Sequence, residues 1–392
     1  MITLPVKVSA MLILLLTSSH LWAQSCIAVA GTRIDPNIVY DTRHQCGTCA
    51  GQREKPLLCG AINRMMVPFW SASADVVGIP ERGYWGRPTA NDAPEGTLKA
   101  AKEALKAGYR IMRFSVFFTG LDAHNEHQLL TGRFKPITAY GGPAGKYVWD
   151  YPPESLVAFN VRKRDQSRSF EADERLVLFS ELLKWAADNQ VLLVVDPVSG
   201  YASAQILELA RSTGALANLA LRSDVRGYWQ TMQSIRGHLP NLYSAYEGRF
   251  LWQPPVNSVT ANSWNETRIL INDWHTNTAQ SKQVLAYQAY LYSDTHWSTL
   301  PLSDGGRSYS NLIEYIKELT PTGKRTSMWT LNTMGDKGWL HSDYRWNFLA
   351  NTAADTRGSP WRNLAYKFAT HLAIISDRPE WYEGMTENPY PQ

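Results

Sequence analysis

The sequence predicts one α/β barrel in which parallel strands alternate with helices and close into a (β/α)8 ring of the TIM type. Segments with helical periodicity alternate with short apolar runs along most of the chain. The strand candidates number close to eight, which favours closure into a barrel. The chain of 392 residues, 44% hydrophobic and 19% charged, has enough apolar material for one such domain.

The best-marked helix and strand lie between residues 92 and 118. Asp92 is predicted to cap the helix, with Glu95 completing a capping box, and Gly108 is expected to end it in the left-handed conformation. The apolar run Ile111–Phe118 follows and predicts a buried strand. A helix that leads into a buried strand is half of a βαβ unit.

The remaining elements follow the same alternation. Helices are expected at Phe170–Asn189, Ser203–Arg211, Asp224–Gly237, Gln280–Tyr292, Asn311–Leu319 and Trp361–Thr370. Strands are expected at Arg64–Trp70, Val191–Val195, Asn218–Leu221, Arg249–Gln253, Arg268–Asn272, Arg325–Leu331 and Leu372–Ser376. Residues 120–169 are expected to form a long loop insertion after the second strand, on the face where such barrels place their sites.

The N-terminus predicts export. Residues 1–23 combine an early lysine, an apolar run and a small residue at Ala23, which is typical of a cleaved signal peptide. We expect a periplasmic or secreted protein with a Cys-containing extension at 24–62 and the barrel at 63–392. Acylation of Cys26, as in a lipoprotein, is an alternative. No other stretch has the roughly 18 apolar residues that a membrane helix needs.

All four cysteines fall within 34 residues. In an oxidising compartment, an even and clustered set predicts two disulfides. The pairing stays open. The alternative is a zinc site made from Cys46-x-x-Cys49, Cys59 and either His44 or Cys26. The cysteines are Cys26, Cys46, Cys49 and Cys59.

The net charge and the aromatic content limit the kinds of binding partner that the sequence predicts. A net charge of +4 is small for this length, so the sequence does not predict nucleic-acid binding. Most of the 15 Trp and 19 Tyr residues are expected in the core, and the rest could line a groove for a small headgroup.

Three segments carry a resemblance to a known family. They are Ala93-Pro-Glu-Gly-Thr-Leu through Arg113-Phe-Ser-Val116, Met328-Trp-Thr-Leu-Asn332 and Ile374-Ile-Ser-Asp-Arg-Pro379. Their order and content resemble the glycerophosphodiester phosphodiesterases, which are barrels of the phospholipase-C-like kind. The resemblance implies phosphodiester hydrolysis by two histidines and a divalent cation, Mg²⁺ or Ca²⁺, held by carboxylates.

The sequence departs from that family at several site positions. The family has a His-Arg pair at the end of its first strand, but no histidine occurs between His44 and His124. Its E-x-D metal pair is replaced by Arg113-x-Ser115. These two residues are therefore candidates for binding phosphate directly. Alternatively, Arg113 forms a buried ion pair with Asp196 or another barrel carboxylate.

The second family histidine is matched by His124-Asn125-Glu126, so His124 is a candidate acid or base. The alternative is a solvated loop histidine. The family's E-x-K on the third strand is matched by Asp196 without the lysine. Asp196 is therefore a candidate metal ligand.

The ends of the predicted strands also place polar residues together without reference to the family. Asp273 and His275 follow an apolar run two residues apart, which predicts a metal site with Asp196, or a base oriented by a carboxylate. The alternative is that both are surface loop residues. Trp329 and Asn332 are candidates for binding substrate.

Three functions remain open from the sequence. The first is a phosphoric diester hydrolase acting on a glycerophosphodiester or a phospholipid-type headgroup. The second is a barrel that has lost catalysis and binds a phosphorylated ligand or partner. The third is a glycoside hydrolase with Asp196 and Asp273 as its carboxylate pair.

Overall fold

The protein is described by a computed structural model. The structure describes residues 77–85, 93–132, 137–140, 142–159, 161, 172–197, 199–246, 248–257, 263–278, 283–290, 301–319, 325–329 and 372–376. The predicted signal peptide, the four cysteines, the predicted strand Arg64–Trp70 and the predicted helix Trp361–Thr370 lie outside these residues.

Eight parallel strands form the centre of the fold. Two hydrogen-bonded sheets supply them, in the orders β1-β11-β10-β7 and β2-β4-β5-β6. The strands are β1 (Val77–Pro80), β2 (Ile111–Leu121), β4 (Leu192–Asp196), β5 (Leu219–Leu221), β6 (Leu251–Trp252), β7 (Ala286–Tyr290), β10 (Arg325–Trp329) and β11 (Leu372–Ser376).

Backbone contacts join the two sheets at both edges. Between β1 and β2, the N–H of Arg82 donates to the carbonyl of Arg113 at 2.6 Å. Between β6 and β7, the N–H of Leu285 donates to the carbonyl of Trp252 at 2.7 Å, and Trp252 bridges Val284 in parallel. The eight strands therefore close into a ring, which confirms the predicted (β/α)8 barrel.

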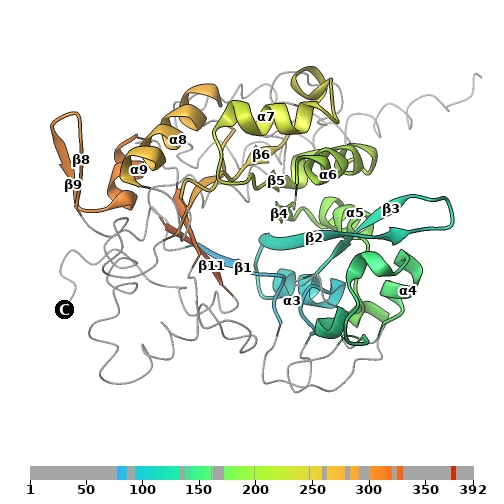
Figure 1. The fold of residues 1–392 in the computed structure, drawn as a ribbon. Coiled ribbons are helices and arrows are strands. Elements are labelled where there is room, and N and C mark those ends of the chain that lie inside the picture. Colours follow the sequence, from blue (N-terminus) through green and yellow to red (C-terminus); the bar gives the residue numbers. More distant parts are fainter. Residues whose placement is uncertain are drawn as a thin grey trace, which may run out of the picture.

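Helices surround the ring (Figure 1). They are α3 (Leu98–Lys106), α5 (Phe179–Asn189), α6 (Gly200–Ser212), α7 (Tyr228–Arg236), α8 (Trp264–Asn277) and α9 (Leu312–Leu319). Short turns add η6 (Leu216–Asn218) and η7 (Leu242–Tyr246), and the hairpin β8 (Leu302–Asp304) and β9 (Arg307–Tyr309) precedes α9. None of the helices in the described ranges is long and apolar enough to span a bilayer.

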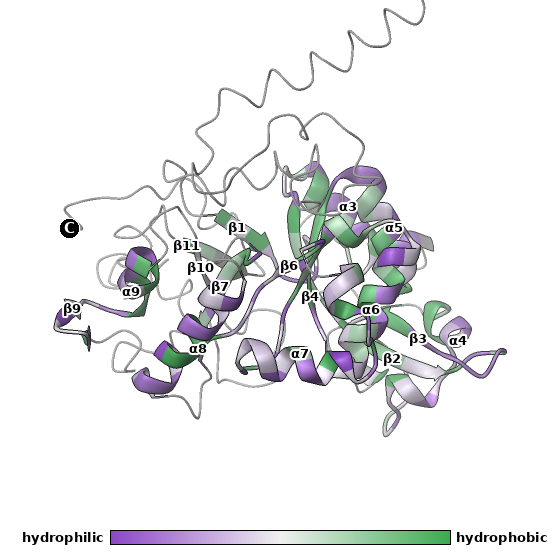
Figure 2. Cartoon of the chain, turned by 90° about the horizontal axis from the view of Figure 1, so that it is seen from above, coloured by the Kyte–Doolittle hydropathy of each residue, from purple (hydrophilic) through white to green (hydrophobic). Residues whose placement is uncertain are grey.

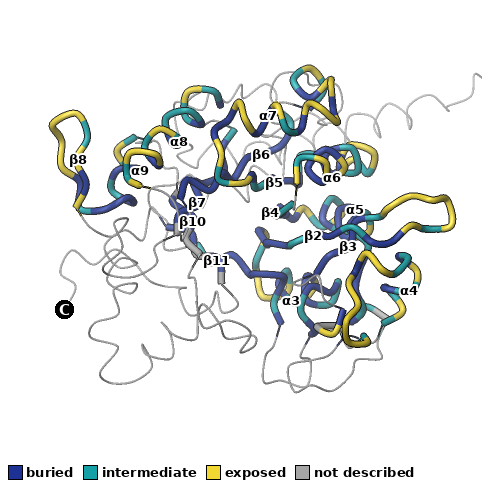
Figure 3. Tube along the Cα trace, viewed as in Figure 1, coloured by how far each residue is buried: buried dark blue, intermediate teal, exposed yellow. Residues whose placement is uncertain are grey.

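Alternation along each strand separates two apolar cores. Inward residues such as Ile79, Val194 and Ala220 fill the barrel interior. Outward residues such as Phe114 and Trp252 pack with the helices into a larger core. The strands of the ring are mostly buried in Figure 3, and apolar residues dominate β1 and β4 in Figure 2.

The described part of the region after β2 contains several short elements. It returns as β3 (His127–Thr131), antiparallel to β2, and continues through η3 (Ile137–Tyr140), η4 (Val148–Asp150), α4 (Pro153–Val157) and η5 (Ala172–Glu174). Its apolar residues form a small core of their own against β2. The predicted insertion at 120–169 therefore contains regular elements and covers one side of the barrel.

Two predicted elements have the wrong type. Residues 268–272, predicted as a strand, lie within α8, and residues 286–290 of the predicted helix Gln280–Tyr292 form β7. In α8, Ser263 and Glu266 form a capping box that starts a helix. Apolar residues run through the sequence of both segments, and periodicity alone does not separate a short apolar strand from part of a helix.

The helix before β2 begins later than predicted. Thr97 is the cap of α3, and its hydroxyl accepts from the N–H of Ala100 at 3.2 Å. Asp92 lies outside the described residues. Gly108 has a φ of +98°, which confirms it as the left-handed stop. The predicted helix at 170–189 is reduced to α5.

Candidate functional site

A layer of polar side chains lines the barrel interior where the strands end. Each of six residues lies two positions beyond an inward apolar residue of its strand and so points to the same side. Ser327 joins them because it pairs in register with Gln288 and with the inward Ala373. We call the seven residues the polar ring: Glu81, Arg113, Asp196, Arg222, Gln253, Gln288 and Ser327.

Arg113 connects the first three strands of the ring. Its Nη1 donates to Oε2 of Glu81, and its Nη2 donates to Oδ2 of Asp196 at 2.5 Å. The Arg113 side chain is 1% exposed and Glu81 is 2% exposed. This confirms the alternative of a buried ion pair for Arg113, because both terminal nitrogens face carboxylates.

Asp196 is held by two guanidinium groups. Its other oxygen, Oδ1, accepts from Nη1 of Arg222 at 2.5 Å. Burial by itself would raise the pKa of Asp196, but Arg222 and Arg113 outweigh burial and leave the pKa below its ordinary value. Asp196 is therefore ionised at neutral pH. It is 19% exposed and Arg222 is 13% exposed, so solvent reaches this part of the ring.

Two glutamines continue the ring on its other side. Nε of Arg222 donates to Oε1 of Gln288 at 2.5 Å, and Nε2 of Gln253 donates to Oγ of Ser327 at 2.7 Å. Both glutamines are fully buried. The remaining amide atoms, Nε2 of Gln288 and Oε1 of Gln253, have no hydrogen-bond partner.

A second ion pair supports the ring from outside. Nη1 of Arg82 donates to Oε1 of Glu81 at 3.0 Å, and its Nε pairs with Glu95. Glu95 was predicted to complete a capping box, and the structure instead places it in this pair. Glu81 and Arg82 directly follow β1, where the family resemblance expects a His-Arg pair.

The charges of the ring do not suit a divalent cation. Two carboxylates alternate with two guanidinium groups, so the ring has no net negative charge to attract a metal. Both oxygens of Asp196 already face arginines. Within the described ranges, no group of three His, Cys, Asp or Glu side chains could hold a metal ion.

Ser115 is close to the ring but not part of its hydrogen bonds. It lies two residues beyond Arg113 on β2 and pairs in register with Asp196. Its side chain is half-buried. The predicted pair Arg113-x-Ser115 therefore does lie at the end of the barrel, but Arg113 is already occupied by carboxylates.

His124 does not reach the ring. It is exposed in the turn between β2 and β3, which projects away from the helix ring in Figure 1. Its backbone N–H donates to Oδ1 of Asp122 at 2.8 Å. The prediction that His124 matches the family's second histidine after the strand is not supported by this position. It is the solvated loop histidine of the alternative.

Asp273 and His275 lie on α8 and not at a strand end. Oδ2 of Asp273 accepts from the N–H of Tyr228 at 2.6 Å, and Oδ1 accepts from Nδ2 of Asn277 at 2.8 Å. Asp273 thus caps the start of α7. On a helix, residues two apart do not share a face. The structure therefore does not bring Asp273 and His275 to one side of a strand, as the predicted metal site or carboxylate-oriented base requires. Burial lowers the pKa of His275.

Some predicted site residues cannot be placed. The side chain of Trp329, all of Asn332, and Cys26, Cys46, Cys49 and Cys59 lie outside the described residues.

Sequence reasoning missed most of the polar ring. Arg222 and Gln253 carried a usable signal, because each directly follows an apolar run that was predicted as a strand. Gln288 was hidden by the helix predicted over β7. Glu81 was missed because the first strand was placed earlier in the chain.

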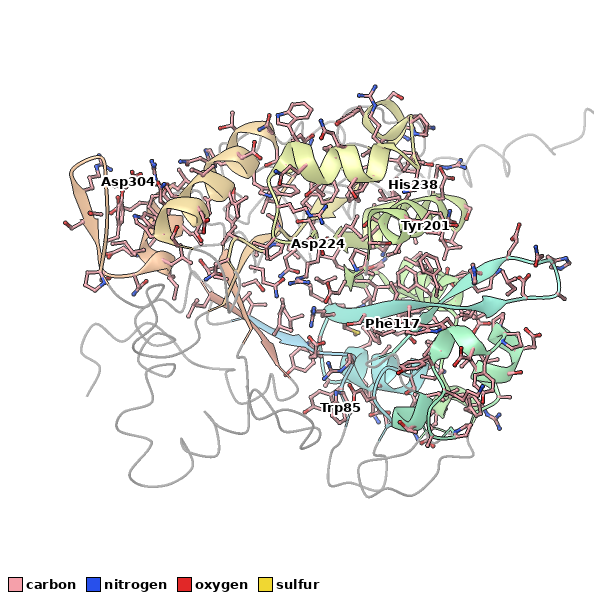
Figure 4. The ribbon with its side chains drawn as sticks, in the orientation of Figure 1. Trp85, Phe117, Tyr201, Asp224, His238 and Asp304 are labelled. Atoms are coloured by element: carbon pink, nitrogen blue, oxygen red, sulfur yellow. The ribbon has the colours of Figure 1, made fainter. Side chains whose placement is uncertain are left out.

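A small pocket lies beside the ring, between α6 and α7. Ser203, Ser223 and Thr231 line it, and each of their hydroxyls donates to a backbone carbonyl. Figure 4 labels Asp224 at this pocket and Tyr201 with His238 nearby, whose rings meet edge to face at 5.2 Å. These three hydroxyl groups are thus satisfied within the protein.

The fold and site define an α/β barrel whose carboxyl end holds alternating arginines and carboxylates. No protein-family profile and no curated protein sequence matches the chain. It is similar in structure to a glycerophosphoryl diester phosphodiesterase from Parabacteroides distasonis, at 14% identity, covering 81% of this chain and 88% of the other, with a TM-score of 0.49.

Two further solved structures are similar. One, from Silicibacter pomeroyi, assigned the same activity, is 14% identical, covers 83% of this chain and 99% of its own, and has a TM-score of 0.48. A glycerophosphodiester phosphodiesterase from Agrobacterium tumefaciens is 12% identical and covers 78% and 98%, with a TM-score of 0.42.

Proposed function

We propose that the barrel binds and hydrolyses a phosphodiester at its carboxyl end, with guanidinium groups in the place of a metal ion. The single observation that carries this proposal is the contiguous set Glu81, Arg113, Asp196 and Arg222, with two arginines fixed by charge-assisted bonds. Arginine is the side chain best suited to bind a phosphate group, because its planar fork matches two oxygens. The glycerophosphodiester or phospholipid-type headgroup expected from the sequence is the substrate class we test.

Arg222 is the arginine that we expect to meet the phosphate. It is more exposed than Arg113, and its position is fixed by Asp196 and Gln288. Fixed donors need little reorganisation as charge develops on a phosphoryl oxygen. Arg113 then acts as a positioning residue, because its ion pair with Asp196 orients that carboxylate.

Asp196 is the carboxylate that can reach a ligand. Hydrolysis requires a water oxygen to attack phosphorus while the bond to the alcohol oxygen breaks, and the departing alcohol takes up a proton. The ionised Asp196 is suited to orient that water by accepting a hydrogen bond from it. Its lowered pKa makes it a weak base, so the proposal assigns it orientation and not the full proton transfer.

A second candidate is a barrel that binds a phosphorylated ligand without cleaving it. One observation favours it: the described part of the ring contains no histidine, and both terminal nitrogens of Arg113 face carboxylates. A glycoside hydrolase with Asp196 and Asp273 is not proposed, since the structure separates their roles.

The test is hydrolysis and binding of a panel of phosphodiesters by the purified protein. The panel holds a chromogenic diester, glycerophosphodiesters and phospholipid vesicles, each with chelator or with Mg²⁺, Ca²⁺, Mn²⁺ or Zn²⁺. We expect turnover that survives the chelator and is lost in Arg222→Ala. Arg307→Ala, which removes a 76% exposed arginine of β9, is the matched control.

Three outcomes decide between the candidates. Chelator-resistant turnover that requires Arg222 supports hydrolysis. Phosphodiester binding by calorimetry without turnover, again lost in Arg222→Ala, supports the binding barrel. Turnover that needs a metal and survives Arg222→Ala would overturn the assignment of the ring as the site.

The proposal includes export to the periplasm or the medium, with disulfides among the four cysteines. It is supported by the signal-type N-terminus and by the clustering of the cysteines. Mass spectrometry of the protein from fractionated cells, with and without reductant, tests both the cleavage after Ala23 and the oxidation state.

A further inference from the structure

We infer that Ser115 is the nucleophile of the proposed reaction, so that hydrolysis runs through a covalent seryl phosphodiester. The inference rests on the proposed function and deepens it, because it names the attacking atom at the same end of the barrel. Its basis is the place of Ser115 on β2, two residues beyond Arg113 and in register with Asp196 of β4.

The side chain of Ser115 points into the barrel. On the same strand, Ile111 belongs to the interior core, and Arg113 reaches the carboxylates of the polar ring. Phe114 and Val116 instead pack outward in the larger core against the helices. Successive residues of a strand point to opposite faces, so Ser115 lies on the inner face with the ring.

The strand register brings the Ser115 hydroxyl next to the Asp196 carboxylate. The two residues are partners on the parallel strands β2 and β4, and both side chains point inward. Neighbouring strands lie about 4.7–4.9 Å apart, which is the spacing between the two backbones here. The carbonyl of Ser115 accepts from the N–H of Gly132 at 3.0 Å, so the strand is also held on its other side. The backbone ladder therefore fixes the hydroxyl beside the carboxylate.

The Ser115 hydroxyl is free and accessible to solvent. Within the described residues it makes no hydrogen bond, whereas the hydroxyls of Ser203 and Thr231 in the neighbouring pocket donate to backbone carbonyls. The Ser115 side chain is half-buried, Asp196 is 19% exposed and Arg222 is 13% exposed. Neighbouring strands thus present a hydroxyl, a carboxylate and a guanidinium group to solvent at one end of the barrel.

The charges around Ser115 suit attack on phosphorus. A serine hydroxyl is a weak nucleophile unless a neighbouring group accepts its hydrogen bond, and Asp196 is that neighbour. Arg113 and Arg222 each donate to Asp196 at 2.5 Å, so two cations flank the place of attack. Fixed cations of this kind stabilise the negative charge of a phosphoryl group in transfer.

The reaction then consists of two displacements. In the first, Oγ of Ser115 attacks phosphorus, the bond from phosphorus to the alcohol oxygen breaks, and the serine proton ends on the departing alcohol. Asp196 accepts the hydrogen bond of the hydroxyl in this step, as an aspartate does for the attacking hydroxyl in kinases. In the second, the water that Asp196 orients attacks phosphorus, the bond to Oγ breaks, and the serine oxygen takes up a proton of the water. The products are the alcohol and a phosphomonoester.

The experiment follows the configuration at phosphorus with 4-nitrophenyl propyl phosphate, which has no hydroxyl of its own to attack phosphorus. One stereoisomer of its phosphorothioate analogue is hydrolysed in water enriched in heavy oxygen. Each displacement inverts phosphorus, so two displacements give net retention and direct attack by water gives inversion. We expect retention. Mass spectrometry after an acid quench of the turnover of the oxygen ester should also find a propyl phosphoryl group on the peptide that contains Ser115.

Three variants distinguish a nucleophile from a residue that only binds the phosphate. Ser115→Ala should lower kcat roughly 100-fold or more, and the Kd for methyl propyl phosphate, measured by calorimetry, should stay within about twofold. Ser115→Thr keeps the hydroxyl and should keep part of the turnover. Ser308→Ala, which changes an exposed serine of β9, is the matched control and should leave kcat unchanged.

Retention together with a modified Ser115 peptide supports the inference. Inversion overturns it and leaves the proposed function standing, with water as the direct nucleophile. A Ser115→Ala variant that keeps its kcat and binds methyl propyl phosphate more weakly also overturns it, because Ser115 is then only a phosphate ligand. Cleavage of glycerophosphodiesters without cleavage of the propyl ester overturns it as well, because the reaction then depends on a hydroxyl of the substrate. A wild type that cleaves no diester refutes the proposed hydrolysis and the inference together.

Discussion

Replacing Arg113 by methionine tests whether the polar ring is held by its ion pairs. The substitution keeps an unbranched side chain of similar length but removes the cation between Glu81 and Asp196. Glu81 is 2% exposed, so its charge cannot be solvated in place. We expect a large loss of unfolding free energy.

The size of that loss follows from the partners that remain. Removing one partner of a buried ion pair costs about 3–5 kcal/mol. Here Glu81 keeps Arg82 at 3.0 Å and Asp196 keeps Arg222 at 2.5 Å, so the residual charges stay partly compensated. We therefore expect about 2–4 kcal/mol, which a protein with a total stability of about 5–15 kcal/mol survives.

The loss of unfolding free energy in Arg113→Met should depend on pH in a definite direction. The pKa of Asp196 is lowered in the folded state, so its ion pairs stabilise the protein above the ordinary carboxyl pKa of about 4, and this contribution is lost as pH falls through the folded value. In Arg113→Met part of that contribution is already absent. The gap between wild type and variant should thus be full at pH 7 and should narrow below about pH 4.

The assay is urea unfolding followed by tryptophan fluorescence at pH 7 and at about pH 3. Adding Glu81→Gln to Arg113→Met should recover part of the loss, because it removes the buried charge that was left unpaired. Arg307→Met, an exposed ion-pair arginine, should cost less than about 1 kcal/mol. A loss below about 1 kcal/mol for Arg113→Met, or a gap that widens at low pH, would refute the reasoning.

Three further predictions concern other parts of the structure and use the same unfolding assay. Gly200→Ala should cost about 1–3 kcal/mol of unfolding free energy, because its Cβ would lie 2.7 Å from the carbonyl oxygen of Ser234. Gly214→Ala is the control: its φ is +71° but the space around it is open, so it should cost about 1 kcal/mol. Equal losses in the two variants would argue against close packing of α6 on α7. Asp273→Ala should cost about 1 kcal/mol of unfolding free energy, because α7 loses its cap, and should leave any turnover unchanged. Loss of turnover in a folded variant would instead indicate that Asp273 belongs to the functional site. Burial, with the charge of Asp304, raises the pKa of Tyr315 to about 12. The unfolded tyrosine ionises first, so the wild type should lose stability as pH rises above about 10. Tyr315→Phe should lose less stability over that range, and parallel curves of unfolding free energy against pH for the two proteins would contradict the prediction.

The sequence alone determined the repeating strand–helix order and most of the strands. Apolar runs bounded by glycine and polar residues gave the strands that end at Asp196, Leu221 and Ser376, and these are found as β4, β5 and β11. Burial of apolar residues is a local property of the chain, so periodicity and length carry it. The same reasoning placed Arg113, Ser115 and Asp196 at the carboxyl end of the barrel.

The tertiary structure decided which elements carry the site and how its charges are paired. Asp273 and His275 follow an apolar run that suits either a helix or a strand, and only packing made it α8. Arg113 meets Glu81 across 32 positions and Asp196 across 83 positions of the chain. Ion pairs of this kind form because ring closure brings strand ends together, and that closure is a property of the whole sheet which local sequence patterns do not encode.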